Sequence, residues 1–553
     1  MVQATPLTDL LYNNAPPNSL DLMIIQERTE AMAKSIAKLR DELKPLEEQL
    51  HLYKCVFSPA RRIPTEVLTM IFDLVSTKPP QSTYYDDIWE RDTKSLSTIP
   101  LVCKRWRDVA YNTGHLWAVR KASIPFLTQE QCGALLQSYG RSKGTPKTLK
   151  LETPYHHCPC YEQIGGTQHC SNAVLKRLLE EGAPFSQLSM AKFTPTCFKN
   201  IVRYIKSTNT TFTTTSAVQH WWDKVEKLVL DFRHGNGNEK DPYWLQSQLP
   251  AQSIFASFPD SLTSLTLHLN YLHNEPHRKF LEIPAAVLKK LTTFSLTYNW
   301  GGPQFLTALQ HCTNVENLSL CIGHNMCFRS ANLGDRVNVS SLSQDGHIVL
   351  PKVNSLVLNI TDEVKDFGVL RFPGLQELSI YSEDGYSTIL EAIGLFSPDA
   401  PQSFASLTVV GDIEADDLYH LLGSITSPVT HLTTDASFDP REFLKLAQGA
   451  PAGTPNLLPS LQSLEVRAFP SRFHLDSLFL YIKSRQKHGK KKGEIVMEPP
   501  YDRLKWVMLE ITGYERELQK AYYKESATLK MLRESFGIKV DRMGYDYELE
   551  SDT

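Results

Sequence analysis

Hydrophobic residues follow two different spacings along this chain, and the change between them divides the sequence. From Ser19 to about residue 120, apolar residues recur every three or four positions, which is the spacing of one face of an α-helix. Beyond residue 120 the recurring pattern is apolar-x-x-apolar-x-apolar, with helix-like stretches between its copies. The sequence therefore predicts an α-helical N-terminal part followed by a larger α/β part.

The first helical pattern covers residues 19–57, where apolar positions alternate steps of four and three, the heptad seam of a coiled coil. This seam consists of Ile25, Thr29, Met32, Ile36, Leu39, Leu43, Leu46, Leu50 and Tyr53. Pro45 lies within it and removes one backbone hydrogen bond. Two packings stay open: a parallel homodimer through this helix, or a seam that lies along the next helices of the same chain.

Residues 1–18 are polar, contain Pro16-Pro17, and are expected to form a flexible arm.

Two further helices are predicted within residues 58–120, after a break between Ser58 and Arg62. The first has apolar residues at four-residue spacing, with more apolar residues beside them: Ile63, Val67, Ile71 and Val75, flanked by Pro64, Leu68 and Phe72. In the second, one face is shared by Val102, Trp106, Val109 and Ala110, and Gly114 supplies the stop. On spacing alone, these could be two helices of an ordinary bundle whose Trp and Leu residues fill an internal core.

The order of residues in this region resembles a known module. Ile63, Pro64, Glu66 and Leu68, then LVCKRWR at 101–107, then Leu116-Trp117 are similar to the F-box, a short three-helix module. The resemblance implies docking on a Skp-type adaptor, which joins the module to a cullin-RING ubiquitin ligase. The contact positions that it implies are Ile63, Pro64, Val67, Leu68, Leu101, Val102, Cys103, Trp106, Leu116 and Trp117. The link from Ser76 to Lys94 is longer than usual between the first two F-box helices.

The second pattern recurs through residues 121–512 and resembles the strand segment of a leucine-rich repeat. Clear copies are Val225-Leu228-Leu230, Leu262-Leu265-Leu267, Leu291-Phe294-Leu296, Val315-Leu318-Leu320, Val353-Leu356-Leu358, Leu375-Leu378-Ile380, Phe404-Leu407-Val409 and Leu461-Leu464-Val466. Weaker copies lie at Leu149-Leu151, Phe185-Leu188-Met190, Val429-Leu432 and Leu504-Val507-Leu509. We expect an irregular leucine-rich-repeat-like α/β solenoid, with a parallel sheet on its concave face and helices outside. The alternative is a doubly wound α/β domain, in which strands and helices also alternate.

Residues 513–540 read as a C-terminal helix that caps the open end of the array, followed by an acidic tail at 541–553. The 553 residues are 41% hydrophobic and 22% charged, which is enough for more than one core. The net charge of −3 gives no general attraction to nucleic acid or anionic membranes. No signal-like N-terminus or membrane-spanning run is present, so a soluble cytoplasmic or nuclear protein is expected, with its ten cysteines as buried thiols.

Three features could carry chemistry or ligand binding. The densest set of metal-type ligands is His156, His157, Cys158, Cys160, His169 and Cys170. Its spacing is irregular for zinc, and a plain loop is the favoured interpretation. The run KSRQKHGKKK at 483–492 is either a solvated loop or a nuclear-import or anion-binding segment, and Trp221-Trp222 is interpreted as packed core. No catalytic motif and no cofactor site is found.

These patterns together lead to one expected function and its alternatives. The chain is expected to be a substrate-recognition subunit of a cullin-RING ligase, which binds the adaptor and cullin through the F-box and an unknown target through the repeats. It would catalyse no reaction itself. The first alternative is an interaction scaffold that takes no part in ubiquitin transfer, and the second is an intracellular hydrolase or zinc enzyme. The order of helix, F-box and repeats resembles the large F-box families of mushroom-forming fungi.

Overall fold

The computed structural model divides into two compact units, residues 1–116 and residues 117–553, each of which is described by itself. The structure describes residues 16–57, 61–78, 90–91, 93–124, 127–153, 172–207, 221–232, 253–269, 281, 283–298, 305–322, 347–360, 369–382, 389, 405–411, 413–425, 428–435, 438–449, 457–469, 475–485, 488–491, 494–497, 504–511, 530, 534 and 539–543. Most of the expected N-terminal arm, at 1–15, lies outside these residues.

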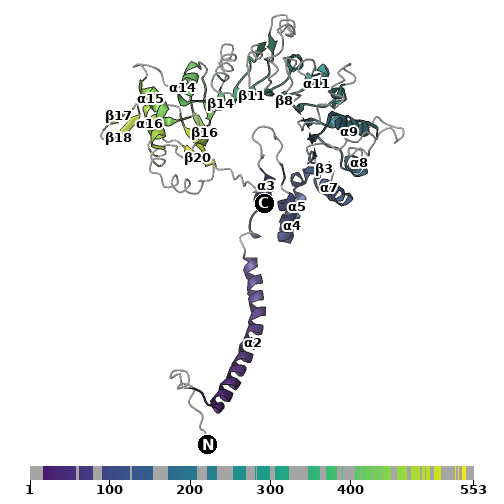
Figure 1. Ribbon diagram of the computed structural model, residues 1–553, viewed down its shortest axis with the longest axis vertical. Coiled ribbons are helices and arrows are strands. Elements are labelled where there is room, and N and C mark those ends of the chain that lie inside the picture. The colour runs from purple at the N-terminus through teal and green to yellow at the C-terminus, as the bar shows by residue number, and fades with distance from the viewer. Residues whose placement is uncertain are drawn as a thin grey trace. The chain divides into compact units, whose positions relative to one another are not determined.

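The first unit begins with one long helix, α2 (Ser19–Val56), which continues through Pro45 (Figure 1). Its N-terminus is closed by a reciprocal pair of hydrogen bonds. The backbone N–H of Asp21 donates to Asn18 Oδ1 at 2.9 Å, and the N–H of Asn18 donates to Asp21 Oδ2 at 3.2 Å. The leucines of the heptad seam are exposed, Leu39 to 63%. Within the first unit, the other described helices therefore do not cover the seam.

Four shorter helices follow and form a small helical module. They are α3 (Thr65–Ser76), α4 (Thr93–Val102), α5 (Lys104–Asn112) and α6 (His115–Ala118). The expectation that Val102 shares a helix face with Trp106 was wrong, because the helix is interrupted at Cys103 between α4 and α5. Cys103 has extended backbone, and its sulfur accepts the N–H of Trp106 as the N-cap of α5. Val102 is consequently exposed at the end of α4, whereas Val109 and Ala110 of α5 are buried.

The long link between α3 and α4 begins and ends as an antiparallel pair of two-residue strands. Strand β1 (Thr77–Lys78) pairs with β2 (Glu90–Arg91), so that Thr77 lies opposite Arg91. Residues 79–89 of this link lie outside the described part of the chain. The pairing brings the two ends of the link together, which lets a long insertion leave and return at one place.

The second unit is a leucine-rich-repeat-like α/β solenoid built on one parallel sheet of 14 strands. The strands are β3 (Val119–Ser123), β4 (Thr148–Glu152), β5 (Gln187–Ala191), β6 (Lys227–Asp231), β7 (Ser264–His268), β8 (Thr293–Tyr298), β9 (Asn317–Ile322), β11 (Ser355–Ile360), β13 (Glu377–Ser382), β14 (Ser406–Gly411), β15 (His431–Thr434), β16 (Ser463–Phe469), β19 (Trp506–Ile511) and β20 (Lys539–Met543). They lie side by side in chain order. A doubly wound domain needs a reversal of strand order, so that alternative is excluded.

Helices cover the outer side of the sheet, and the strands line the inner edge of the arc that this unit forms in Figure 1. The connecting helical segments are α7 (Gln129–Arg141), α8 (Ala173–Glu181), α9 (Pro195–Ser207), η5 (Trp221–Lys224), η8 (Ile254–Ser257), α11 (Ala285–Leu288), α12 (Phe305–Leu309), α14 (Ala415–Ser424), α15 (Pro440–Gly449) and α16 (Leu475–Arg485). Between β9 and β13, the described parts of the connections contain β10 (Ile348–Val349) and β12 (Leu370–Arg371), which form a second, two-stranded parallel sheet. Residues 323–346 and 361–368 of these connections lie outside the described part of the chain.

A backbone hydrogen-bond ladder repeats just before the sheet strands from β5 to β19. The carbonyl of Glu226 accepts the N–H groups of both Thr263 and Ser264, and the carbonyl of Thr263 in turn accepts those of Thr292 and Thr293. The same double acceptance continues through the carbonyls of Lys147, Ser186, Thr292, Glu316, Asn354, Gln376, Ala405, Thr430 and Gln462. This ladder satisfies main-chain donors between repeats without help from side chains, whereas the buried apolar rows select the register.

The apolar positions of the sequence repeat form a continuous core between the sheet and the outer layer. Leu228, Leu265 and Phe294 are adjacent in register on neighbouring strands and are completely buried. Residues 539–543 extend the sheet as β20, across the expected boundary between the capping helix and the acidic tail. Apart from residues 530 and 534, the rest of the predicted helix at 513–540 and of the tail at 541–553 lies outside the described part of the chain. A hairpin of β17 (His488–Lys491) and β18 (Glu494–Met497) lies outside this sheet.

Candidate functional site

Helix α3 has an apolar face on each of two sides. Leu68 and Phe72 point into the module and are buried. Val67, Met70 and Leu74 recur at helical spacing on another side and are exposed, Leu74 to 76%. Apolar side chains that stay in water across two helical turns are typical of a surface that binds another protein.

Aromatic and polar contacts hold α3 against α5 and α6. The ring centroids of Phe72 and Trp106 lie 5.1 Å apart at an interplanar angle of 58°. The hydroxyl oxygens of Thr69 and Thr113 are 3.5 Å apart. His115 Nε2 lies 3.3 Å from the carboxylate oxygen Oδ1 of Asp73. These contacts hold α3 with its Leu68 face inside and its Val67 face in solvent.

Two arginines fix the chain on either side of the exposed residues. The Arg105 guanidinium donates hydrogen bonds to the carbonyl oxygens of Arg61 and Ile63, which tie the entry of α3 to α5. Arg107 Nε donates to the carbonyl oxygen of Pro100 at 3.0 Å, across the junction between α4 and α5. This junction leaves Leu101 exposed to 74%.

Comparison with known proteins gives one family match and a structural likeness. Residues 60–120 match the family model described as F-box-like. These residues form an F-box-like domain. The chain is also similar to the leucine-rich repeat-containing protein LegL7 from Legionella pneumophila, with 14% sequence identity and a TM-score of 0.30, over 77% of this chain and 90% of that one. Comparison with curated proteins gives no match.

The structure places the residues that the F-box resemblance implied in three groups. Pro64, Val67, Leu101, Val102 and Cys103 are exposed, and Ile63 and Trp106 are half-buried. Leu68, Leu116 and Trp117 are buried. Buried side chains cannot contact an adaptor in this conformation, so in the proposed surface they have a supporting role.

Trp117 packs inside the second unit. Its ring lies 5.3 Å from the guanidinium carbon of Arg120 and 4.8 Å from that of Arg141, as in cation–π contacts. The chain is divided between Leu116 and Trp117, before the predicted F-box boundary at residue 120. Trp117 therefore packs with the solenoid, although it belongs to α6 and to the F-box-like match at 60–120.

Met70 and Leu74 belong to the exposed face of α3 but were not predicted as contact residues. The available signal was that α3 has apolar residues on nearly every side, which a helix with a single packed face does not need. Periodicity identifies such a helix, yet it cannot say which side faces solvent. The exposure of both residues in the folded module supplies that answer.

A second candidate surface is the solvent side of the sheet. One row of residues in register runs from Ser189 through Thr266, Ser295 and Ser319 to Ser379, with valines at β6 and β11. Ser189 and Thr266 of this row are buried, and the serines of β8, β9 and β13 are half-buried. Charged residues share this face, as in the Lys121 Nζ–Glu152 Oε2 ion pair at 2.5 Å and in Lys227, Asp231 and exposed Glu377 on the strands that carry the row. This surface therefore offers both partly accessible hydroxyl groups and charge.

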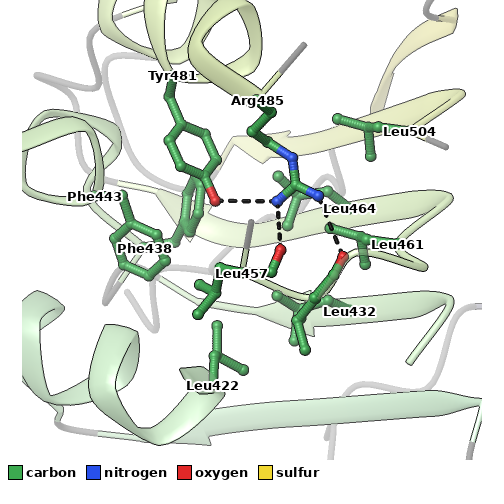
Figure 2. Close-up of a pocket in the computed structure, with 11 residues that line it drawn as sticks. Leu422, Leu432, Phe438, Phe443, Leu457, Leu461, Leu464, Tyr481, Arg485 and Leu504 are labelled. Carbon is green, nitrogen blue, oxygen red and sulfur yellow. Dashed lines mark hydrogen bonds between the residues drawn. The ribbon is translucent and has the colours of Figure 1, made fainter. Parts of the chain in front are cut away.

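An apolar pocket lies between α14, α15, α16 and the sheet (Figure 2). Its lining residues are Leu422, Leu432, Phe438, Phe443, Leu457, Leu458, Leu461, Leu464, Tyr481, Arg485 and Leu504. Arg485 Nη1 donates to the carbonyl oxygen of Leu457 at 2.9 Å and to the Tyr481 hydroxyl at 3.3 Å, and Nη2 donates to the carbonyl of Leu458 at 3.2 Å. The guanidinium thus orders the turn before β16. We interpret this pocket as part of the repeat core.

The remaining predicted features have different outcomes. The cluster from His156 to Cys170 lies outside the described residues, among which no group of three metal-type ligands occurs. Trp222 is fully buried and its Nε1 donates to the carbonyl of Ser257 at 3.0 Å, so its interpretation as core is confirmed. Arg485 of the basic run points into the core.

Burial raises the pKa of the Cys312 thiol to about 12, which keeps it protonated. Of the helices that the structure describes, none is long and apolar enough to cross a membrane.

Proposed function

We propose that this protein is the substrate-recognition subunit of an SCF-type cullin-RING E3 ubiquitin ligase. The F-box-like domain binds a Skp-type adaptor, and through it cullin, while the solenoid binds a target protein. The observation that carries this proposal is the exposed apolar surface of the F-box-like domain, on α3 and at the end of α4. Val67, Met70, Leu74, Leu101 and Val102 are its anchors.

Burial of these side chains supplies the binding free energy. Removing one aliphatic side chain from water contributes about 1.5–3 kcal/mol, so a few anchors offset the loss of rigid-body freedom on association. The backbone around them is already ordered by Arg105, Arg107 and the Phe72–Trp106 contact. A preformed surface loses less conformational entropy on binding, which favours affinity.

The role of the chain in ubiquitin transfer is positional. It holds a target lysine at high effective concentration near the charged conjugating enzyme that the ligase supplies, and it breaks no bond itself. Half-buried serines on β8, β9 and β13, with Lys227, Asp231 and Glu377 on the same face of the sheet, support recognition of the target by hydrogen bonding and charge. The alternative, a scaffold outside ubiquitin transfer, predicts binding to the adaptor without cullin.

Titration of the purified full-length protein with a Skp-type adaptor tests the proposal. The double variant Val67→Glu, Leu101→Glu replaces two exposed anchors without touching the core, and we expect at least a hundredfold loss of affinity. Leu480→Glu is the control, because Leu480 is an exposed apolar residue of α16 in the solenoid. Equal binding by wild type, double variant and control would contradict the proposed surface. Capture of adaptor but not cullin from a eukaryotic lysate would favour the scaffold.

A further inference from the structure

The exposed seam of α2 remains unexplained by adaptor and target binding. All apolar seam residues from Met32 to Tyr53 are at least half exposed in the single chain, and Ile25 near the start is half-buried. The large exposed members are Met32, Ile36, Leu39, Leu43, Leu46, Leu50 and Tyr53. Exposing a continuous apolar stripe of this length on a 38-residue helix to water is unfavourable in free energy, and packing against another helix removes that exposure.

We propose that α2 binds α2 of a second copy of this chain in an antiparallel coiled coil. In heptad terms, Thr29, Ile36, Leu43 and Leu50 take the a positions. Met32, Leu39, Leu46 and Tyr53 take the d positions. Pro45 falls at a c position, on the side away from the seam, so its ring does not obstruct the partner helix.

The orientation follows from the distribution of charge along α2. Residues 28–40 contain the cations Arg28, Lys34, Lys38 and Arg40 against the single anion Glu30, a net charge of +3. Residues 41–48 contain the anions Asp41, Glu42, Glu47 and Glu48 against the single cation Lys44, a net charge of −3. An in-register parallel pair sets like blocks side by side, whereas an antiparallel pair sets opposite blocks against each other.

At the positions that flank the seam, both orientations bring some like charges together. In a parallel in-register pair, each g residue faces the e residue five positions later in the partner helix. The only charged pair produced this way is Glu42 with Glu47 of the second copy, which is repulsive and occurs twice. The antiparallel pair removes this contact, but with Ile36 against Leu46 it sets Glu42 beside Glu42 and Arg40 beside Arg40 of the second copy. The flanking positions therefore do not choose the orientation, and the charge blocks carry it. The antiparallel seam still closes, because each a residue packs against a d residue of the second copy, as Ile36 does against Leu46.

This dimer has a geometric consequence for the F-box-like domains. A helix of 38 residues at 1.5 Å per residue is about 57 Å long. Each domain follows the C-terminal end of its own α2, so the antiparallel dimer holds the two domains at opposite ends of the coiled coil. Two adaptors can then bind at once without competing for space.

Light scattering and sedimentation of the full-length protein over a concentration series test the dimer. We expect wild type to be dimeric and Leu50→Glu, at a seam position, to be monomeric. Leu52→Glu is the matched control, because Leu52 is an exposed leucine two residues further on but off the seam. A monomeric wild type, or equal loss of dimer in both variants, would overturn the proposal.

The variant Glu47→Lys separates the two orientations. In a parallel pair it converts the Glu42–Glu47 repulsion into attraction, so the dimer would become tighter. In an antiparallel pair it weakens the attraction between the charge blocks, and we expect the dissociation constant to rise about threefold to tenfold. A tighter Glu47→Lys dimer would overturn the antiparallel arrangement. Adaptor binding is measured separately, so this outcome is independent of the proposed function.

Discussion

Phe72 of α3 and Trp106 of α5 lie with ring centroids 5.1 Å apart and join the first and third helices of the F-box-like domain. Trp106 is only half-buried, so one part of its indole packs against Phe72 while another part is left in solvent. The tryptophan that the sequence motif marks for adaptor contact is therefore also a structural residue. Its removal would change both the surface and the fold beneath it.

Trp106→Ala is accordingly expected to destabilise the domain by about 2 kcal/mol, with Trp106→Phe retaining part of the packing. Because a two-unit chain need not unfold in one step, hydrogen exchange of α3 and α5 is the suitable measurement. Faster exchange across both helices is expected for the alanine variant. Leu101→Ala, which changes an exposed residue, should leave the exchange unchanged. Unaltered exchange in Trp106→Ala would show that the aromatic contact contributes nothing to the fold.

Arg105→Met is expected to loosen the entry of α3. The variant leaves the carbonyl oxygens of Arg61 and Ile63 without their guanidinium donor, at a cost of about 1–2 kcal/mol because the site is partly exposed. Lys104→Met, at the exposed neighbouring position, is the control. Faster hydrogen exchange at 61–68 in Arg105→Met alone is the expected result. If both variants behave alike, the arginine has no special role.

Arg485→Met should destabilise the C-terminal repeats by about 2–4 kcal/mol, because it removes the donor to Leu457 and Leu458 within an apolar pocket. Lys483→Met removes a positive charge from the same helix at a more exposed position. Thermal unfolding of the two variants should differ clearly, with Arg485→Met melting lower. Similar melting would contradict a structural role for the buried guanidinium.

Two glycines are expected to respond to alanine with opposite signs. A Cβ on Gly411 would lie 2.4 Å from the carbonyl oxygen of Ser382 in the neighbouring strand, so Gly411→Ala should cost about 1–3 kcal/mol. Gly133 lies inside α7, where an added Cβ would meet nothing within 4 Å, so Gly133→Ala should stabilise the protein by about 0.5–1 kcal/mol. Urea unfolding measures both. A tolerated Gly411→Ala would mean that β13 and β14 can separate locally.

The buried thiol of Cys312 predicts a loss of stability at alkaline pH. Burial raises the pKa of Cys312 from 9.0 to about 12, so below pH 9 the thiol is neutral in both folded and unfolded chains. Above pH 9 only the unfolded thiol ionises, and the free energy of unfolding falls by about 1.4 kcal/mol by pH 10. Cys312→Ala should lose this part of the pH dependence, while Cys103→Ala, at an exposed position, should keep it. Identical pH profiles in all three proteins would contradict the assignment.

Where local pattern and global packing agree, the sequence predicted the structure. The seam helix, the F-box-like helices and strands such as Leu265-Leu267 were found because their apolar spacing is also the periodicity of their helix or strand. Strand β3 was missed, because its buried positions include Arg120, whose charge hides the strand pattern. Strand β20 was predicted as the end of a helix and the start of a tail. The local sequence could not reveal the strand, because its formation depends on pairing with the distant β19.

The sequence predicted where the candidate site lies, but it could not predict which of its side chains face solvent. The motif identified the segments around Pro64 and Leu101, but it could not separate exposed Val67 from buried Leu68 at the next position. That distinction depends on how α3 packs against α5, which is a tertiary property. The exposure of Met70 and Leu74 depends on the same packing.

The main-chain ladder between repeats has a consequence for how such a protein can diverge. Each of these carbonyls accepts two amide groups of the next repeat, and the buried rows hold the strands in register, so neither depends on which side chains face solvent. Substitutions on the exposed rows can then accumulate without displacing the backbone. Proteins that share this frame can differ widely on their surface, provided that the buried rows stay apolar.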